Sequence, residues 1–174
     1  MSELSYPIGK FRAPERMDAS ERSGWIDTIA AAPARLRAAV AGLNDGQLDT
    51  PYRPGGWTVR QTIHHIADSH MNSYLRMKFA VTETDPLVKA YDEAEWAKLH
   101  DASTMPVEPS LALIDGLHAR WVVFLRSLDE AGWKKAFVHP EHGRLPVDRA
   151  TALYAWHAKH HEAHITGLRQ REGW

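Results

Sequence analysis

The chain has 174 residues, which is enough for one domain with a buried core and too few for two comfortable ones. Its formal net charge of -1 provides no global positive field for a phosphate backbone, so a nucleic-acid partner is not expected. The absence of cysteine excludes disulfides, thiolate zinc sites and cysteine nucleophiles, and the 11 histidines make imidazole and carboxylate the available metal ligands.

Residues 1–19 predict an extended arm, because they contain Pro7 and Pro14 and show no helical period. Their first segment, MSELSYPIGKF, lacks the apolar stretch of a secretory signal. No later run of apolar residues approaches the ~20 that cross a bilayer. We therefore expect a cytoplasmic protein without a membrane partner.

Four long helices are predicted after this arm. The first contains Pro33, which conflicts with an unbroken helix and predicts a kink or a restart. The second begins at Thr58, because Gln61 three residues later completes a capping-box pattern. Pro109 suits the first turn of the third helix, and Gly173 marks the end of the fourth. The predicted ranges are about 20–43, 58–84, 109–129 and 148–171.

The connections between these helices carry turn residues. The segment 44–56 is turn-rich, a short helix is expected from Asp92 to His100, and residues 139–146 predict a loop or a small hairpin. Because there is almost no strand signal, the natural arrangement is all-α. We expect a single domain over residues 1–174, in which an antiparallel four-helix bundle with long connecting loops encloses one core.

The last predicted helix carries four histidines within the twelve residues YAWHAKHHEAHI. Residues four apart share one face of a helix, so His157 pairs with His161 and His160 pairs with His164. At about 100° per residue, His157 and His161 fall near the middle of the apolar stripe. Inward pairs of this kind place metal ions in bundle cores, although a single inward histidine is more often a hydrogen-bonded core residue. Two imidazoles are also incomplete, since catalytic zinc usually takes three protein ligands.

The helix predicted over 58–84 offers a third ligand. Its segment HHIADSH contains His64, His65, Asp68 and His70. His64 lies nearer to the apolar stripe than His65, which shares a polar face with Asp68. That face is either solvent-exposed surface or the wall of an internal polar pocket, and helical phase leaves the choice open.

Four segments together resemble the DinB superfamily, and most closely its YfiT-like branch of metal-dependent hydrolases. They are GGWTVRQTIHHIADSHMNSY, LYAWHAKHHEAHI, YPIGKF and YDEAEWAKLHD, so the resemblance spans nearly the whole chain. It implies a four-helix bundle with one divalent ion held by three histidines. The first ligand of the family pattern follows the tryptophan of the WTV segment by eight positions, which is His65 when counted from Trp57. The other two ligands fall on His157 and His161, and His64 stays the alternative to His65.

The resemblance implies a metal-dependent hydrolase with one divalent metal ion, zinc first and nickel as the alternative. Three neutral imidazoles leave the full charge on the ion, and a water in the open position then has its pKa lowered to about 7 in well-built zinc sites. The same position can bind a thiolate, and relatives in the superfamily include transferases that use low-molecular-weight thiols. A metal-dependent S-transferase is therefore the alternative, and a metal-binding stress protein without turnover is a further one.

Two more residues are predicted to be catalytic. Asp68 lies one turn from His65 and is a candidate base, or an acceptor for a ligand imidazole, with a solvated surface carboxylate as the alternative. His164 lies three residues past His161 and is a candidate proton shuttle, with a core histidine bonded to a backbone carbonyl as the alternative. As partners we expect a small-molecule substrate, in the transferase case also a low-molecular-weight thiol, and from the resemblance a homodimer.

Overall fold

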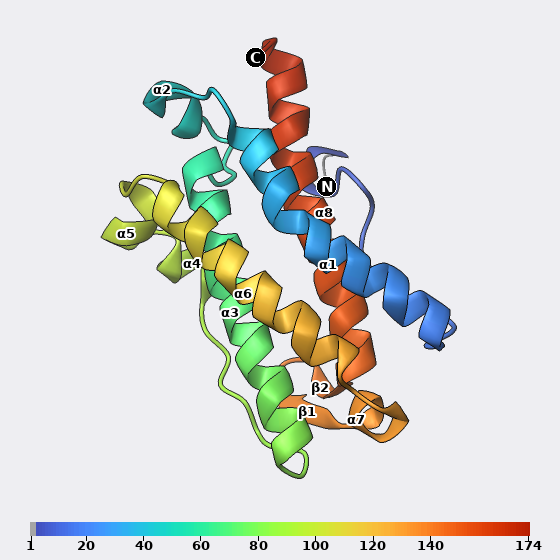
Figure 1. Cartoon of the computed structure of the whole chain (residues 1–174). Coiled ribbons are helices and arrows are strands. Elements are labelled where there is room, and N and C mark those ends of the chain that lie inside the picture. Colours follow the sequence, from blue (N-terminus) through green and yellow to red (C-terminus); the bar gives the residue numbers. More distant parts are fainter. Residues whose placement is uncertain (1–2) are drawn as a thin grey trace.

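The computed structural model describes residues 3–174 and consists mainly of helices (Figure 1). Its elements in chain order are η1 (Glu3–Ser5), α1 (Ala19–Val40), α2 (Asp45–Leu48), α3 (Val59–Thr82), α4 (Glu93–Trp96), α5 (His100–Ser103), α6 (Glu108–Arg126), α7 (Glu130–Lys134), β1 (Ala136–His139), β2 (Gly143–Pro146) and α8 (Val147–Glu172). The long helices α1, α3, α6 and α8 confirm the predicted all-α class. Their ends lie within three residues of the predicted ones.

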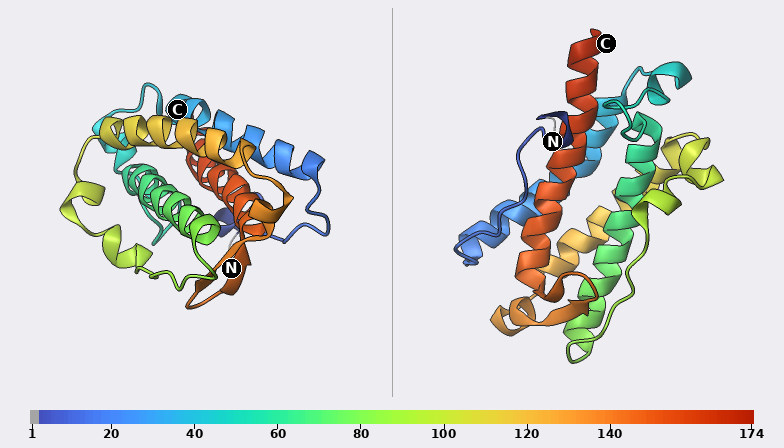
Figure 2. Two further views of the ribbon diagram at one scale, coloured as in Figure 1. Left: turned by 60° about the horizontal axis from the view of Figure 1, so that its bottom comes forward. Right: turned by 180° about the vertical axis from the view of Figure 1, so that it is seen from behind.

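The four long helices form a bundle in which α1 and α3 each lie against both α6 and α8. Helices α1 and α8 run toward one end of the bundle, whereas α3 and α6 run toward the other (Figures 1 and 2). The neighbouring pairs α1–α6 and α3–α8 are therefore antiparallel, as expected, while α1–α8 and α3–α6 are parallel. The connection over residues 83–107 permits this order, because it returns the chain along the bundle before α6 begins.

Local hydrogen bonds set the ends of the long helices. The predicted capping box of α3 is confirmed: the Gln61 N–H donates to the Thr58 hydroxyl at 3.1 Å, and the Thr58 N–H donates to the Gln61 side chain at 3.0 Å. The Asp18 carboxylate caps α1 by accepting from the Glu21 N–H at 3.0 Å. Gly173 ends α8 with a φ of 73°, in the left-handed region that glycine adopts without strain.

Helix α1 continues through Pro33 without interruption, so the predicted restart is wrong. Proline has no N–H, and in an α-helix the N–H of each residue normally donates to the carbonyl four residues earlier. The Ile29 carbonyl therefore cannot receive its helical hydrogen bond at Pro33. It instead accepts a hydrogen bond from Nδ1 of His118 on α6, at 2.7 Å, and this contact compensates for the missing one.

The connections hold more short elements than the sequence predicts. The turn-rich segment 44–56 contains α2, and the single helix expected from Asp92 to His100 is divided between α4, which Asp92 caps, and α5. Strands β1 and β2 pair antiparallel with Phe137 opposite Leu145, so the hairpin alternative for residues 139–146 is confirmed. This hairpin and α7 cover the end of the bundle at which α8 begins (Figure 1).

The interior contains two apolar clusters with a layer of histidines between them. One cluster includes Ile26, Met77 and Trp121, and the other includes Ile63 and Ile165. The histidines of this layer contact one another between α3, α6 and α8, and they are His65, His70, His118, His157 and His161. The three helices therefore contribute their imidazoles to one connected group in the interior.

The predicted N-terminal arm runs along α8 (Figure 1). Residues 1 and 2 of this arm lie outside the described residues, and residues 6–18 contain neither helix nor strand. The Tyr6 ring lies 5.8 Å from the His160 ring, and the Phe11 ring lies 6.0 Å from the Trp156 ring. Within residues 3–174, no helix combines the length and the apolar character that crossing a bilayer requires.

Candidate metal centre

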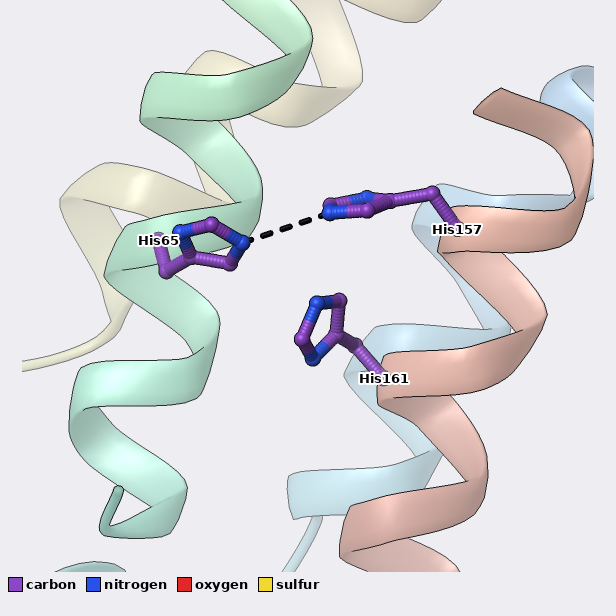
Figure 3. Close-up of side chains that lie close together, drawn as sticks. All are labelled: His65, His157 and His161. Atoms are coloured by element: carbon purple, nitrogen blue, oxygen red, sulfur yellow. Dashed lines mark hydrogen bonds between the residues drawn. The ribbon is translucent and has the colours of Figure 1, made fainter. Parts of the chain in front are cut away.

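The structure brings together the three predicted metal ligands. His65 on α3 and His157 and His161 on α8 each offer a ring nitrogen, and these nitrogens all lie within 4.8 Å of one another. The Nε2 atoms of His65 and His157 are 3.2 Å apart. Figure 3 shows His65 and His157 facing each other across the space between the two helices, with the His161 ring directed into the same space. The i,i+4 pair on α8 and one residue of α3 therefore converge from opposite sides.

This donor set fits a divalent ion. Zinc bound by histidine has Zn–N distances of about 2.0–2.1 Å, so two nitrogens of a tetrahedral site lie about 3.4 Å apart. The separation of 3.2 Å between the Nε2 atoms of His65 and His157 is close to that value. Three imidazoles without a carboxylate or a thiolate suit zinc, nickel, copper or iron and leave a coordination position for a water or a substrate.

All three imidazoles are held in their neutral form. Burial lowers the pKa of His65 to about 4, and the charge of His160 adds to the effect. Burial also lowers the pKa values of His157 and His161 well below the ordinary value, and the neighbouring histidines lower them further. Metal ligands must be unprotonated, so at neutral pH the three residues are ready to bind an ion without losing protons.

Two cavities meet at this centre. One, of about 300 Å³, is lined by four α8 histidines together with His65 and aromatic side chains, among them Trp57 and Trp156. The other, of about 650 Å³, extends from His157 past Tyr154 toward the β1–β2 hairpin. His157 and Glu93 line both cavities. A small molecule in the larger cavity would therefore reach the candidate metal ligands at His157.

The polar face of α3 is pocket wall at two positions. His65 is 5% exposed, and its ring packs against the Trp57 ring with centroids 4.5 Å apart. Arg76, three turns further along α3, lines the larger cavity. His65 therefore does not point into solvent, because neighbouring aromatic side chains and residues of α8 cover this face of α3.

His64 turns away from the centre. Its Nε2 donates to the Met105 carbonyl at 3.1 Å, which leaves Nδ1 to accept from the Ser110 hydroxyl at 2.8 Å. Both ring nitrogens are thus engaged with residues at the start of α6. The geometry supports His65, and not its neighbour, as the partner of His157 and His161.

The two predicted catalytic residues lie in different places. His164 lines the smaller cavity, stacks on Tyr52 with centroids 3.9 Å apart, and has Nδ1 3.4 Å from Nδ1 of His161. Burial lowers its pKa to about 4. Asp68 is half-buried on the side of α3 that faces α5, where burial and the charge of Asp101 raise its pKa to about 6. Among the residues described as lining the two cavities, Asp68 does not appear.

Two buried histidines lie behind the centre: the sequence offers His70 only among the candidates for a third ligand, and sequence reasoning missed His118. Nδ1 of His157 lies 3.0 Å from Nε2 of His70, and Nδ1 of His70 lies 2.8 Å from Nε2 of His118. His70 and His118 are 0% and 1% exposed. His118 is a lone histidine in an otherwise apolar stripe of α6, and that isolation is the only sequence signal that could have marked it. Glu93 was also missed, since its connection carries no pattern that predicts a cavity.

A helical bundle that gathers three neutral imidazoles beside a cavity defines a class: four-helix-bundle proteins with a candidate metal centre. The chain belongs to the DinB superfamily, whose family model matches residues 28–165.

Its relatives are similar over their full length. A Geobacillus kaustophilus protein, GK0616, is 54% identical over 173 residues, covering 98% of this chain and 97% of its own. A Bacillus licheniformis protein is 51% identical and covers 100% and 99%. Both are named for an inferred metal-dependent hydrolase activity. The solved structure of YfiT from Bacillus subtilis, described with the same inferred activity and an unusual four-helix-bundle topology, superposes with a TM-score of 0.96 at 46% identity, covering 99% of both chains.

Proposed function

We propose that the protein is a metal-dependent hydrolase with one divalent ion, zinc or nickel, bound by His65, His157 and His161. The observation that carries the proposal is the convergence of three neutral imidazoles with nitrogens within 4.8 Å of one another. All three line the cavity of about 300 Å³, and His157 also lines the cavity of about 650 Å³. The inferred activity of the relatives supports the same class of reaction.

The ion would supply Lewis-acid activation of a water at neutral pH, because three uncharged ligands leave its charge undiminished. The chain supplies the rest. Trp57 packs on His65 and fixes its ring, and His157 presents one ring edge to the centre and the other to His70. Burial keeps these rings unprotonated, so their lone pairs stay available to the ion.

A proton acceptor is available on α4. The Glu93 carboxylate lines both cavities, and desolvation raises its pKa above the ordinary value, which makes it a stronger base. His164 is less suited, since its pKa of about 4 makes its neutral ring a weak base. We therefore propose Glu93, ahead of Asp68 and His164, as the residue that takes the proton of the attacking water.

The larger cavity is the proposed substrate site. Its wall contains hydroxyl groups, the Arg76 guanidinium and the carboxylate of Glu93, together with apolar side chains such as Phe137 and Leu145. This mixture fits a small polar molecule. It also has room for a thiol and an electrophile beside the open coordination position, so thiol transfer is the reaction that the experiment must compare with hydrolysis.

The test is activity of the zinc-loaded and nickel-loaded protein against ester, amide and electrophile-plus-thiol panels. Hydrolysis that requires the metal and is lost in His161→Ala supports the proposal. Turnover only with an added thiol makes the protein a transferase, and metal binding without turnover leaves a metal-binding protein. His100→Ala, which removes an exposed histidine of α5, is the matched control and is expected to behave like the natural sequence.

The homodimer is also a proposal. Trp174, which the sequence offers for an interface, packs partly buried against the apolar cluster of its own chain that includes Leu36 and Ile165. Exposed apolar side chains remain elsewhere, for example Leu87 at 76% and Val123 at 70% exposure. Sedimentation equilibrium of the metal-free and metal-loaded protein measures the mass directly, and a monomer in both states contradicts the dimer.

A further inference from the structure

A continuous row of hydrogen-bond contacts crosses all four long helices and ends at the metal centre. The groups in this row, the Ile29 carbonyl and the rings of His118, His70 and His157, are called the file. It begins at the Ile29 carbonyl on α1, which lies 2.7 Å from Nδ1 of His118 on α6. Nε2 of His118 lies 2.8 Å from Nδ1 of His70 on α3, and Nε2 of His70 lies 3.0 Å from Nδ1 of His157 on α8. Nε2 of His157 then faces His65 across the centre. Every contact of the file is of hydrogen-bond length.

The carbonyl at the start of the file determines its direction. A carbonyl oxygen can only accept, so Nδ1 of His118 must carry a hydrogen. The neutral ring of His118 then has a lone pair on Nε2, and Nδ1 of His70 must donate to it. By the same argument Nε2 of His70 accepts, and Nδ1 of His157 donates. The remaining lone pair of His157 lies on Nε2, the nitrogen that faces the centre.

Other arrangements of these hydrogens are disfavoured. Three contacts require three hydrogens, and three neutral imidazoles carry one each. Reversing any one ring places two hydrogens or two lone pairs in one contact. Reversing the whole file leaves the Ile29 carbonyl without a donor, and Pro33 prevents the helix from supplying one. No competing solvent reaches His70 or His118, which are 0% and 1% exposed, so water cannot repair such a mismatch.

Aromatic packing holds the imidazole rings of the file in their orientations. The rings of His70 and His118 are parallel, with centroids 5.0 Å apart and an interplanar angle of 10°. The Trp121 ring stands edge-on to both, 5.7 Å from each. Tyr154 stands edge-on to the other side of His70 at 5.3 Å. Neither imidazole can turn over without displacing these buried rings.

We propose that His118 and His70 are positioning residues that hold His157 as its Nδ1–H tautomer, with Pro33 making the Ile29 carbonyl available as the anchor. The Nε2 lone pair of His157 is thereby directed at the metal centre before an ion arrives. This proposal rests on the proposed function for the identity of the centre. It adds a role for two histidines and a proline that do not touch the ion.

The first test is the tautomeric state of each histidine, measured by ¹⁵N–¹H NMR on metal-free protein with labelled histidine. We expect Nδ1–H at His70, His118 and His157. His64 is the internal reference, because its Nε2 faces the Met105 carbonyl and the opposite, Nε2–H, tautomer is expected there. An Nε2–H tautomer or a mixture at His157 overturns the proposal, whether or not the protein binds a metal.

The second test is zinc affinity, measured by competition with a chromophoric chelator. His70→Phe removes both contacts of its ring, and we expect a loss of about 10–100-fold, the usual range for residues that orient a metal ligand. His70→Gln keeps one acceptor and one donor and is expected to restore most of the affinity. His64→Gln, a buried histidine on the same helix outside the file, is the control and is expected to change it little.

The two tests separate the proposals. Nδ1–H at His157 in a protein that binds no metal contradicts the proposed function and leaves the tautomer assignment intact. Tight zinc binding with equal affinities for His70→Phe, His70→Gln and the natural sequence supports the metal centre and overturns the positioning role. If His70→Phe does not fold, the NMR measurement on the natural sequence still decides.

Discussion

The candidate metal centre has an inner flank and an outer flank, and the two are built differently from the same residue type. The inner flank is His157 with His70 and His118 behind it, and its contacts of 2.7–3.0 Å end at a backbone carbonyl. The outer flank is His161 with His160 and His164. Its nearest contact, between Nδ1 of His161 and Nδ1 of His164, is 3.4 Å long.

The outer flank combines ring stacking with longer hydrogen bonds, since Nε2 of His164 donates to the Ser5 carbonyl at 3.4 Å. His164 stacks on Tyr52 and His160 stacks on Trp156, with centroids 3.9 and 4.4 Å apart. Nδ1 of His160 is buried and has no hydrogen-bond partner among residues 3–174. Contacts of 3.4 Å hold the tautomer of a ring less strictly than the contacts of 2.7–3.0 Å on the inner flank. We therefore expect the candidate ligand His157 to be oriented more strictly than the candidate ligand His161.

Removing a ligand from either flank is expected to have the largest effect. His157→Ala and His161→Ala each leave two imidazoles at the centre. We expect zinc affinity to fall by more than about 100-fold, which is the largest usual loss when a residue that only orients a ligand is replaced. Isothermal titration with zinc measures the change. If either variant binds zinc as tightly as the natural sequence, that flank does not supply a ligand.

The stability of the metal-free protein is expected to fall as the pH falls below about 6.5. The histidines of both flanks, with His65, have lowered pKa values: about 4 for His65, His160 and His164, and well below the ordinary value for His70, His157 and His161. Between those values and the ordinary one, the unfolded chain binds protons that the folded chain does not. For each such proton, the free energy of unfolding falls by about 1.4 kcal/mol for every unit by which the pH decreases.

Two carboxylates, Asp68 and Glu93, act in the opposite direction, because burial raises the pKa of each. The raised pKa of Asp68, about 6, lets the folded state hold a proton that the unfolded state releases, so protonation of Asp68 stabilises the fold as the pH falls. These two carboxylates do not offset the larger number of histidines with lowered pKa values. Urea midpoints at pH 7.5, 6.5 and 5.5 measure the slope, and His160→Gln is expected to reduce it. A midpoint that does not change over this range contradicts the assignment of neutral buried histidines.

Substitution of the residues behind the ligands is expected to separate the flanks. His164→Phe keeps the stacking on Tyr52 and removes two long contacts of 3.4 Å, to His161 and to the Ser5 carbonyl. We therefore expect zinc affinity to fall less than about 10-fold, compared with about 10–100-fold for His70→Phe. The chelator competition described above measures both. Equal losses would show that the outer flank orients its ligand as strictly as the inner one.

The smallest effect is expected from Pro33→Ala. The new N–H at position 33 can donate to the Ile29 carbonyl, which also accepts from His118. Because a carbonyl has two lone pairs, the contact to His118 is weakened rather than lost, and zinc affinity should fall by a few-fold at most. The ¹⁵N shift of Nδ1 of His118 is the more sensitive measurement. An unchanged shift would show that Pro33 has no part in anchoring the file.

The local structure could be predicted from the order of the residues alone. Thr58 and Gln61 fixed the start of α3, Gly173 fixed the end of α8, and helical spacing put His157 and His161 on one inward face. These features depend on residues within one or two turns of each other, and such interactions form wherever the segment is placed. The helical class and one pair of candidate ligands could be predicted for that reason.

Which helix faces meet depends on packing between the helices, and the sequence did not reveal it. Helical phase favoured His64, whose ring nitrogens instead bind Met105 and Ser110, while packing of α3 against α8 selected His65. Asp68 faces α5 because the long connection brings that helix against α3. The file through His70 and His118 needs four helices at one level, and no pattern along a single helix encodes it. The spacing of residues along a helix determines which of them share a face. Which face of another helix packs against them depends on the burial of apolar side chains in the whole bundle.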